Sequence, residues 1–240
     1  MSSMPPPMKH AMIIDFHAHV QPGADHGCSG SDMARRQLAL ARDAGVQAIA
    51  AVSHCYPMRD DIDDYLRRRE RAQNKLQAIT EADPSLPRVF CGSEVTLCPG
   101  LDKLDKLWEL CISGTSVLLT EMPSGKWNTK LIDTLERIRY EQGLDVVLAH
   151  AERYESAEVE QLLRDGYPCQ LNYEAFARMF GTGRLRRWAE SGWVTALGSD
   201  IHRDDNGYNH LRRAQKALGE QLSQQISASS AQKLGLEVKK

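Results

Sequence analysis

The residues near the start of the chain are of types that could form a metal site. The segment IIDFHAHVQPGADHG, residues 13–27, places three histidines and two aspartates directly behind a short apolar run. His17 and His19 lie two positions apart, and this spacing puts both imidazoles on the same face of a β-strand. We therefore interpret them as metal ligands, provided that other strands bring partners to the same end of the fold.

Such partners are present at the ends of other apolar runs. Seven runs have the length of strands, at residues 12–19, 47–54, 88–94, 116–121, 145–150, 167–172 and 193–200. All of these runs except the sixth, which ends at Asn172, finish at a residue of a type that can bind a metal. One such residue alone would more often be an ordinary polar residue, but a set at corresponding positions favours a shared site. Its members are His17, His19, His54, Glu94, Glu121, His150, Asp200 and His202.

Amphipathic segments of helix length separate the apolar runs. They span 31–44, 62–81, 102–112, 128–141, 156–165, 182–191 and 209–222, and the serine-rich tail is expected to add one short helix. Near-continuous apolar strands joined by helices indicate an α/β fold whose parallel sheet is covered by helices. Seven βα units favour a closed or nearly closed barrel. In such a barrel the carboxyl ends of the strands open onto the face that holds the active site.

Composition restricts the class of protein. The 240 residues carry a formal net charge of −2, which argues against nucleic-acid binding, because no excess of basic residues is present to attract phosphates. No apolar stretch has the length of a membrane span or the character of a signal peptide. Six cysteines without a C-x-x-C pair indicate reduced thiols and a cytoplasmic protein. We expect a disordered lead-in over residues 1–11 and a single domain over 12–240.

The donor set predicts the kind of metal. Mixed imidazole and carboxylate ligands suit Mn, Fe or Zn better than Ca or a thiolate zinc site. The donors are too many for one ion, and a carboxylate can bridge, so we expect two or three divalent transition-metal ions. A site of this kind generates hydroxide near neutral pH and holds the oxygens of a transferred group.

The order and spacing of the motifs resemble a known superfamily. DFHAH, SH, GSE, TE, AH and GSDIH, spread over residues 12–220, are together similar to the PHP (polymerase and histidinol phosphatase) superfamily of trinuclear metallophosphoesterases. Within it, HAHVQPGADHG, AHAERY and QLN resemble the bacterial manganese-dependent protein-tyrosine phosphatases encoded with capsule and exopolysaccharide genes. The resemblance implies a distorted seven-stranded (β/α)7 barrel of the PHP type that hydrolyses phosphomonoesters with a metal-bound hydroxide. It also implies Mn or Fe, with Zn as an alternative, and a phosphorylated substrate such as the phosphotyrosine tail of a tyrosine kinase.

The resemblance also implies a ligand set for each ion. The ligands of the first ion would be His17, His19, Glu94 and Asp200. Glu94 would bridge to a second ion, which is also bound by Glu121 and His150. The ligands of the third ion would be His54, His202 and either Asp25 or His26, of which we favour His26.

Arg153, three residues after His150, matches the phosphate-binding arginine of that family. Its ordinary alternative is a surface salt bridge with Glu152 or Glu155. We favour the phosphate role, because the residue directly follows the end of a ligand-bearing strand. The expected catalytic residues are therefore Arg153, Glu94 and Asp200.

Two positions depart from the pattern of the capsule phosphatases. Those enzymes have a D-D-G turn where this chain reads Ala24-Asp25-His26-Gly27. They also carry an arginine shortly after the last motif, whereas here Arg203 is the only arginine close by and Tyr208 lies nearer the expected place. The first departure concerns which branch of the superfamily the chain resembles. The second concerns whether the substrate carries its phosphate on tyrosine.

Other interpretations of the sequence stay open. A PHP-type phosphatase could act on a small molecule such as histidinol phosphate. An amidohydrolase-type barrel also opens with H-x-H, but it generally has a metal-bridging lysine where this chain has Glu121, and Lys126 lies in the loop beyond. A thiol-based tyrosine phosphatase needs an arginine six positions after its cysteine, and Arg59 follows Cys55 too early. A non-catalytic partner domain is the last alternative.

Overall fold

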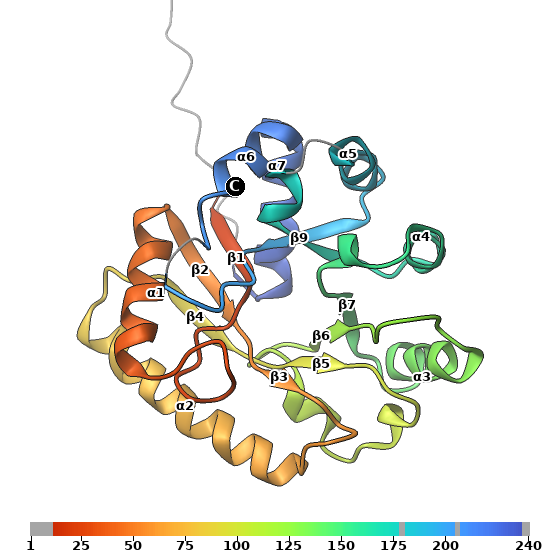
Figure 1. The fold of residues 1–240 in the computed structure, drawn as a ribbon, viewed down its shortest axis with the longest axis horizontal. Coiled ribbons are helices and arrows are strands. Elements are labelled where there is room, and N and C mark those ends of the chain that lie inside the picture. Colours follow the sequence, from red (N-terminus) through yellow and green to blue (C-terminus); the bar gives the residue numbers. More distant parts are fainter. Residues whose placement is uncertain (1–11, 178–180, 205–206, 237–240) are drawn as a thin grey trace, which may run out of the picture.

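The computed structural model describes residues 12–177, 181–204 and 207–236, in which strands alternate with helices (Figure 1). The strands are β1 (Ile13–Ala18), β2 (Val46–Ala51), β3 (His54–Cys55), β4 (Arg88–Cys91), β5 (Glu94–Thr96), β6 (Val117–Glu121), β7 (Asp145–Leu148), β8 (Cys169–Asn172) and β9 (Val194–Gly198). The helices are α1 (Ser31–Asp43), α2 (Ile62–Ala82), α3 (Thr129–Tyr140), α4 (Ser156–Arg164), α5 (Thr182–Glu190), α6 (Leu211–Leu218) and α7 (Glu220–Lys233). The predicted lead-in, residues 1–11, lies outside the described part of the chain.

The strands form two parallel sheets. One sheet holds β1, β2 and β4 in that order, and the other holds β3, β5, β6, β7, β8 and β9. A parallel bridge between Ala18 and Ile201 joins the end of β1 to the residues after β9. Helices α1 to α5 lie around the outside of the strands (Figure 1). The predicted α/β fold with a helix-covered parallel arrangement is therefore confirmed.

Two of the predicted strands are interrupted. The run at 47–54 divides into β2 and β3, and the run at 88–94 divides into β4 and β5. The buried side chain of Gln21 lies at both breaks, because its Nε2 donates to the carbonyls of Ala51 and Gly92 at 2.7 and 2.8 Å. The contacts hold the backbone at the two breaks together, just before β3 and β5 begin.

The helix predicted over 102–112 is wrong. The structure has two 3₁₀ turns there, η1 (Leu101–Lys103) and η2 (Leu107–Leu110). Leucines stand at 101, 104, 107 and 110, a spacing of three that matches the three residues per turn of a 3₁₀ helix. Three of these leucines are buried, so packing of this row against the core favours the tighter turns.

The helix predicted over 209–222 is likewise divided. Helix α6 ends at Leu218, and α7 begins at Glu220. Gly219 between them has φ 81°, a left-handed conformation that glycine adopts without strain and that stops a helix. The predicted short helix of the tail is therefore α7, which is longer than expected and begins directly after this glycine.

Asp15 ties β1 to the segment after β9. Its carboxylate is fully buried and accepts hydrogen bonds from the backbone N and the hydroxyl of Ser199, at 2.9 and 2.6 Å. It also accepts one from the hydroxyl of Tyr208 at 2.7 Å. A buried carboxylate requires such donors. Tyr208, near the place where the family has an arginine, is thus engaged with Asp15.

Apolar side chains fill the space on both faces of the strands. A large cluster lies between strands and helices and includes Leu38, Leu135 and Trp188. A smaller cluster joins β1, β2, β6 and β7 and reaches Ala231 of α7 and Leu234 directly after it. No helix in the described part of the chain is long and apolar enough to cross a membrane.

Gly198, the last residue of β9, allows neighbouring strands to approach closely. A Cβ atom at this position would lie 2.6 Å from the Cβ of His17 and 2.8 Å from Nε2 of Gln170. We predict that Gly198→Ala lowers the free energy of unfolding in urea by about 1–3 kcal/mol, the usual cost of overpacking. Gly183→Ala is the matched control, because a Cβ there would meet only Nη1 of Arg187, at an ordinary contact distance of 3.8 Å. Equal stability of the two variants would contradict this prediction.

Candidate metal centre

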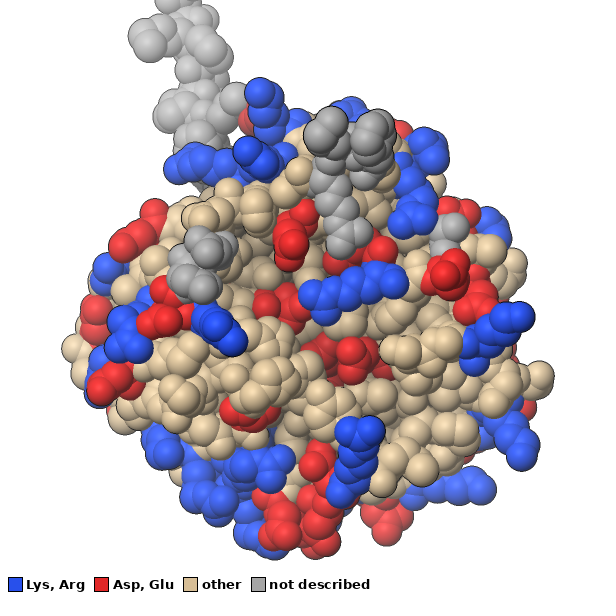
Figure 2. All heavy atoms as spheres, in the orientation of Figure 1, with Lys and Arg blue, Asp and Glu red and all other residues tan. Residues whose placement is uncertain are grey.

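Eight of the predicted ligand residues come together: six lie near or just beyond the carboxyl ends of β1, β6, β7 and β9, and His54 and Glu94 are the first residues of β3 and β5. They extend from β1, β3, β5 and β6 and from the segments that follow β1, β7 and β9. Acidic side chains are visible at the centre of the face shown in Figure 2, with basic ones beside them. The buried members are His17, His19, Glu94 and His150, and the partly exposed members are His54, Glu121, Asp200 and His202.

Three ligand atoms converge beside Asp200. Nε2 of His17 and Nε2 of His19 lie 3.0 Å apart, and Oε2 of Glu94 lies 3.3 and 3.2 Å from them. Oδ1 of Asp200 lies 3.5 and 3.4 Å from the same two nitrogens. Donors bound about 2.1 Å from one ion in a tetrahedron are about 3.4 Å apart. The spacing of the atoms of His17, His19 and Glu94 therefore fits a single metal ion, and Asp200 lies next to its two imidazoles.

Glu94 also faces two further ligand residues. Its Oε1 lies 2.8 Å from Nε2 of His150, and its Oε2 lies 2.9 Å from Nδ1 of His54. Oε1 of Glu121 lies 3.7 Å from the same nitrogen of His150. His54, Glu94 and Glu121 have ligand atoms within 4.8 Å of one another. A carboxylate whose two oxygens face different imidazoles has the arrangement of a bridging ligand.

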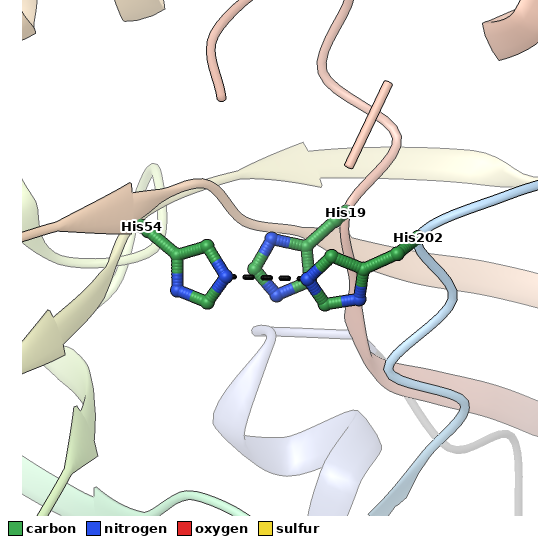
Figure 3. Close-up of side chains that lie close together, drawn as sticks. All are labelled: His19, His54 and His202. Carbon is green, nitrogen blue, oxygen red and sulfur yellow. Dashed lines mark hydrogen bonds between the residues drawn. The ribbon is translucent and has the colours of Figure 1, made fainter. Parts of the chain in front are cut away.

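His19, His54 and His202 form a third group of converging ligand atoms (Figure 3). Nε2 of His54 and Nε2 of His202 lie 3.2 Å apart. Nδ1 of His202 donates to the carbonyl of Asp200 at 2.9 Å, so the lone pair of the neutral ring is on Nε2. His26 is exposed, and its ring stacks on those of His54 and His202 with centroids 4.9 and 5.0 Å apart. It therefore lies beside this group but outside the set whose ligand atoms converge.

Gln170 on β8 contacts two of the predicted ligand residues, a role that the sequence interpretation missed. Its Oε1 accepts a hydrogen bond from Nδ1 of His17 at 3.1 Å and one from the backbone N of His150 at 2.8 Å. Gln170 stands two positions before Asn172, on the same face of the strand. This spacing was the available signal, because the sixth strand ends with amides in place of ligands.

Asp25 holds a ligand in place. Its Oδ2 accepts from Nδ1 of His19 at 2.8 Å and from the backbone N of His54 at 2.9 Å, and its Oδ1 accepts from the backbone N of Gly27 at 2.8 Å. A carboxylate that binds the second nitrogen of a metal-ligating imidazole fixes its tautomer and raises its basicity. This arrangement turns Nε2 of His19 toward the converging donors.

The electrostatics of the cluster require positive charge. Burial on its own would raise the pKa of Glu94, but the imidazoles of His17 and His150 hold it well below its usual value. Burial would likewise lower the pKa of His19, whereas the hydrogen bonds that its ring donates to the carboxylates of Asp200 and Asp25 raise it well above its usual value. Protons and metal ions therefore compete for these donors.

Two buried atoms make the fit to a metal more specific. Nδ1 of His54 and Oε2 of Glu94 are buried and face each other at 2.9 Å without the geometry of a hydrogen bond, and neither has a hydrogen-bond partner elsewhere among the described residues. A buried polar atom without a partner is costly, and coordination of an ion removes the cost. The donor set of imidazoles and carboxylates thus fits divalent transition metals.

Two ligand residues have unusual backbone conformations. His150 and Asp200 have φ of 34° and 53°, and within the described ranges no other residue besides glycines has positive φ. Such conformations cost about 1–3 kcal/mol each and cluster at functional sites. The backbone N of Asp200 donates to the carbonyl of His17 at 2.7 Å, which helps to hold this conformation.

The predicted phosphate-binding arginine reaches the cluster. Nη2 of Arg153 lies 2.5 Å from Oδ2 of Asp200, and its side chain is 46% exposed. Nδ2 of Asn172 donates to the same carboxylate oxygen at 3.1 Å. Burial would lower the pKa of Arg153, but the charge of Asp200 raises it. The surface salt bridge that was its alternative, with Glu152 or Glu155, is not the contact that the structure has.

The fold and the cluster define an α/β protein with a candidate metal centre at the carboxyl ends of its parallel strands. The chain belongs to the CpsB/CapC family of capsular polysaccharide synthesis, which it matches over residues 13–234. The predicted resemblance to the proteins encoded with capsule genes is thereby confirmed. No match was found among the curated proteins with which the sequence was compared.

Solved structures share the fold. One is from a study of YwqE from Bacillus subtilis and CpsB from Streptococcus pneumoniae, reported as unique metal-dependent tyrosine phosphatases, with a TM-score of 0.75 and 19% identity over 95% of this chain and 96% of that chain. A β-aspartyl dipeptidase of Fervidobacterium islandicum has a TM-score of 0.62 and 13% identity over 95% of this chain and 75% of that chain. The N6-methyl-AMP deaminase of Arabidopsis thaliana has a TM-score of 0.59 and 10% identity over 95% of this chain and 93% of that chain. At these identities the likeness concerns the fold alone.

The contact between Asp25 and His19 generates a prediction on metal affinity. Asp25→Asn removes the charge that supports Nε2 of His19 and should weaken Mn²⁺ binding by about 10- to 100-fold. The measurement is titration of metal-free protein with Mn²⁺ by calorimetry. Asp32→Asn is the control, because Asp32 is exposed on α1 and contacts Arg35. An unchanged affinity in Asp25→Asn would show that this hydrogen bond does not support the centre.

Proposed function

We propose that the chain is a metal-dependent phosphatase that hydrolyses phosphotyrosine in proteins. The observation that carries the proposal is Arg153, a half-exposed cation directly beside a buried cluster of imidazoles and carboxylates. A guanidinium in this position can bind two oxygens of a phosphate at once. Membership of the CpsB/CapC family and the likeness to the structure reported for metal-dependent tyrosine phosphatases support the same activity.

We infer that the centre holds two or three divalent ions, with Mn or Fe favoured and Zn as the alternative. The first ligand set is His17, His19, Glu94 and Asp200. The second is Glu94, Glu121 and His150, with His54 close to it. The third is His54, His202 and His26. We place His26 in this set and leave Asp25 out, because the oxygens of Asp25 already accept three hydrogen bonds.

The residues around the centre suit a phosphate dianion. Divalent ions held there would lower the pKa of water and polarise phosphoryl oxygens. Arg153 would bind the non-bridging oxygens and orient the ester. The carboxylates Glu94, Glu121 and Asp200 offset only part of the ionic charge, and the remaining positive charge favours a dianion. A tyrosyl leaving group, with a phenol pKa of about 10, needs less protonation than an alkoxide.

Three finer inferences belong to this proposal. If β2 with β3 and β4 with β5 each count as one interrupted strand, the strands make up a distorted seven-stranded barrel in a single domain over 12–240. The cysteines are buried and free, in agreement with a cytoplasmic protein. The phosphotyrosine tail of a tyrosine kinase is the substrate that the family resemblance favours.

The alternatives are less compatible with the residues in place. Burial raises the pKa of the Cys55 thiol to about 12, so the thiol is protonated at neutral pH and is a poor nucleophile. Glu121 stands at the end of β6, where an amidohydrolase-type barrel would have lysine, and Lys126 is exposed in the following loop. Phosphatase activity on histidinol phosphate is distinguished from the proposal by the substrate screen below.

Purified protein loaded with Mn²⁺ should hydrolyse phosphotyrosine peptides faster than phosphoserine peptides or histidinol phosphate. Glu94→Ala should abolish this activity and reduce the metal content found by elemental analysis, because Glu94 faces four imidazoles. Its fold should persist, because the residue lies at the strand ends. Folded protein that binds no divalent metal, or wild-type activity in Glu94→Ala, would refute the proposal.

Arg153→Ala should lower kcat/KM for phosphotyrosine peptides by the factor that corresponds to a loss of about 2–3 kcal/mol in transition-state stabilisation. This is the range for a lost hydrogen bond to a charged group. The metal content should stay unchanged, because Arg153 contacts a ligand but does not contribute a donor. Arg164→Ala on α4 is the matched control, since Arg164 is exposed and contacts Glu160. Full activity in Arg153→Ala would place phosphate binding elsewhere.

A further inference from the structure

A pocket of about 450 Å³ adjoins the metal centre. The loops that follow β3, β5 and β6 form its walls, and Thr96 and Glu121 belong both to this pocket and to the surroundings of the centre. Tyr56 separates the two regions, because its ring stacks on that of His54 with centroids 5.5 Å apart and also lines the pocket. A substrate with its phosphate at the centre would therefore extend into this pocket.

Two cations stand at the pocket. Arg59 and Lys126 are exposed and line it from opposite loops, one after β3 and one after β6. Neither forms an ion pair with any residue in the part of the chain that the structure describes. Apolar side chains, including Met58 at 76% exposure and the buried Met122, line the space between them. The pocket thus combines an apolar surface with two unneutralised positive charges.

The acidic run that follows Arg59 forms no ion pair with it, and its first residue, Asp60, accepts a hydrogen bond from the backbone N of Tyr56 at 2.7 Å. Asp61 caps α2 by accepting from the backbone N of Asp64 at 2.9 Å. Asp63 pairs with Lys106 at 2.5 Å, and Asp64 pairs with Arg67. Arg59 itself lies over the ring of Tyr56, with its Cζ 6.0 Å from the ring centroid. Its charge is therefore available to a ligand in the pocket.

We propose that this pocket selects protein substrates with carboxylates next to the phosphorylated tyrosine, with Arg59 and Lys126 as their partners. The inference rests on the proposed function and extends it to the sequence around the phosphate. The apolar walls would pack against the ring and the aliphatic stems of the flanking residues. The two cations would then contact side chains of Asp or Glu at the pocket's edge. Exposed pairs of this kind contribute modestly and weaken with salt.

The test compares two phosphotyrosine peptides that differ only in having Glu or Gln at the flanking positions. For the wild-type enzyme, kcat/KM should be about fivefold higher for the Glu peptide at low salt, as expected for two exposed ion pairs. The ratio should fall toward one in 0.5 M NaCl. In Arg59→Ala and Lys126→Ala the ratio should fall to about half of its wild-type value, and in the double variant it should approach one.

The control is the double variant Arg71→Ala and Lys75→Ala, which removes two exposed cations of α2 outside the pocket and should keep the wild-type ratio. Hydrolysis of p-nitrophenyl phosphate by the wild-type enzyme tests the proposed function separately. If this ester is cleaved but both peptides react equally, the inference is overturned and the function stands. If no ester is cleaved, fluorescence anisotropy with non-hydrolysable phosphonate versions of the two peptides decides, and equal affinities overturn the inference.

Discussion

The buried carboxylate of Glu94 is the constraint on which the geometry of the centre depends. Its side chain is fully buried and lies within 3.3 Å of four imidazoles. An ionised carboxylate is costly to bury unless opposite charge and hydrogen-bond partners surround it. No single strand can supply four imidazoles to one point, so β1, β3 and the segment after β7 must all converge on β5. These imidazoles are contributed by His17, His19, His54 and His150.

The irregular parts of the fold place these side chains close together. The breaks in two strands, held by Gln21, come just before His54 and Glu94 and let both residues leave the line of the preceding strand. At the other edge, Asp15 binds Ser199 and so keeps the segment that carries Asp200 against β1. The regular sheet provides stability, and these polar contacts adjust where the donors stand.

Much of the fold, and much of the set of side chains that come together at its centre, was predictable, because strand and helix periods are local. The two-residue spacing of His17 and His19 and the ligand types at strand ends required no structure. The strand breaks were not predictable, because Gln21 contacts carbonyls that are distant in the sequence. The roles of Gln170 and Asp25 depend on which nitrogen of a ring each one meets, and only spatial contacts specify this. The 3₁₀ turns could have been found from the leucine spacing of three.

The bridge between Ala18 and Ile201 joins residues near opposite ends of the described chain. During synthesis the first imidazoles leave the ribosome long before Asp200 and His202 do, since domains are made from the N-terminus onward. Pairings between such distant segments form slowly. A nascent chain therefore carries only part of this set of side chains until the segment after β9 has been made. The candidate centre is thus complete only when nearly the whole chain has left the ribosome.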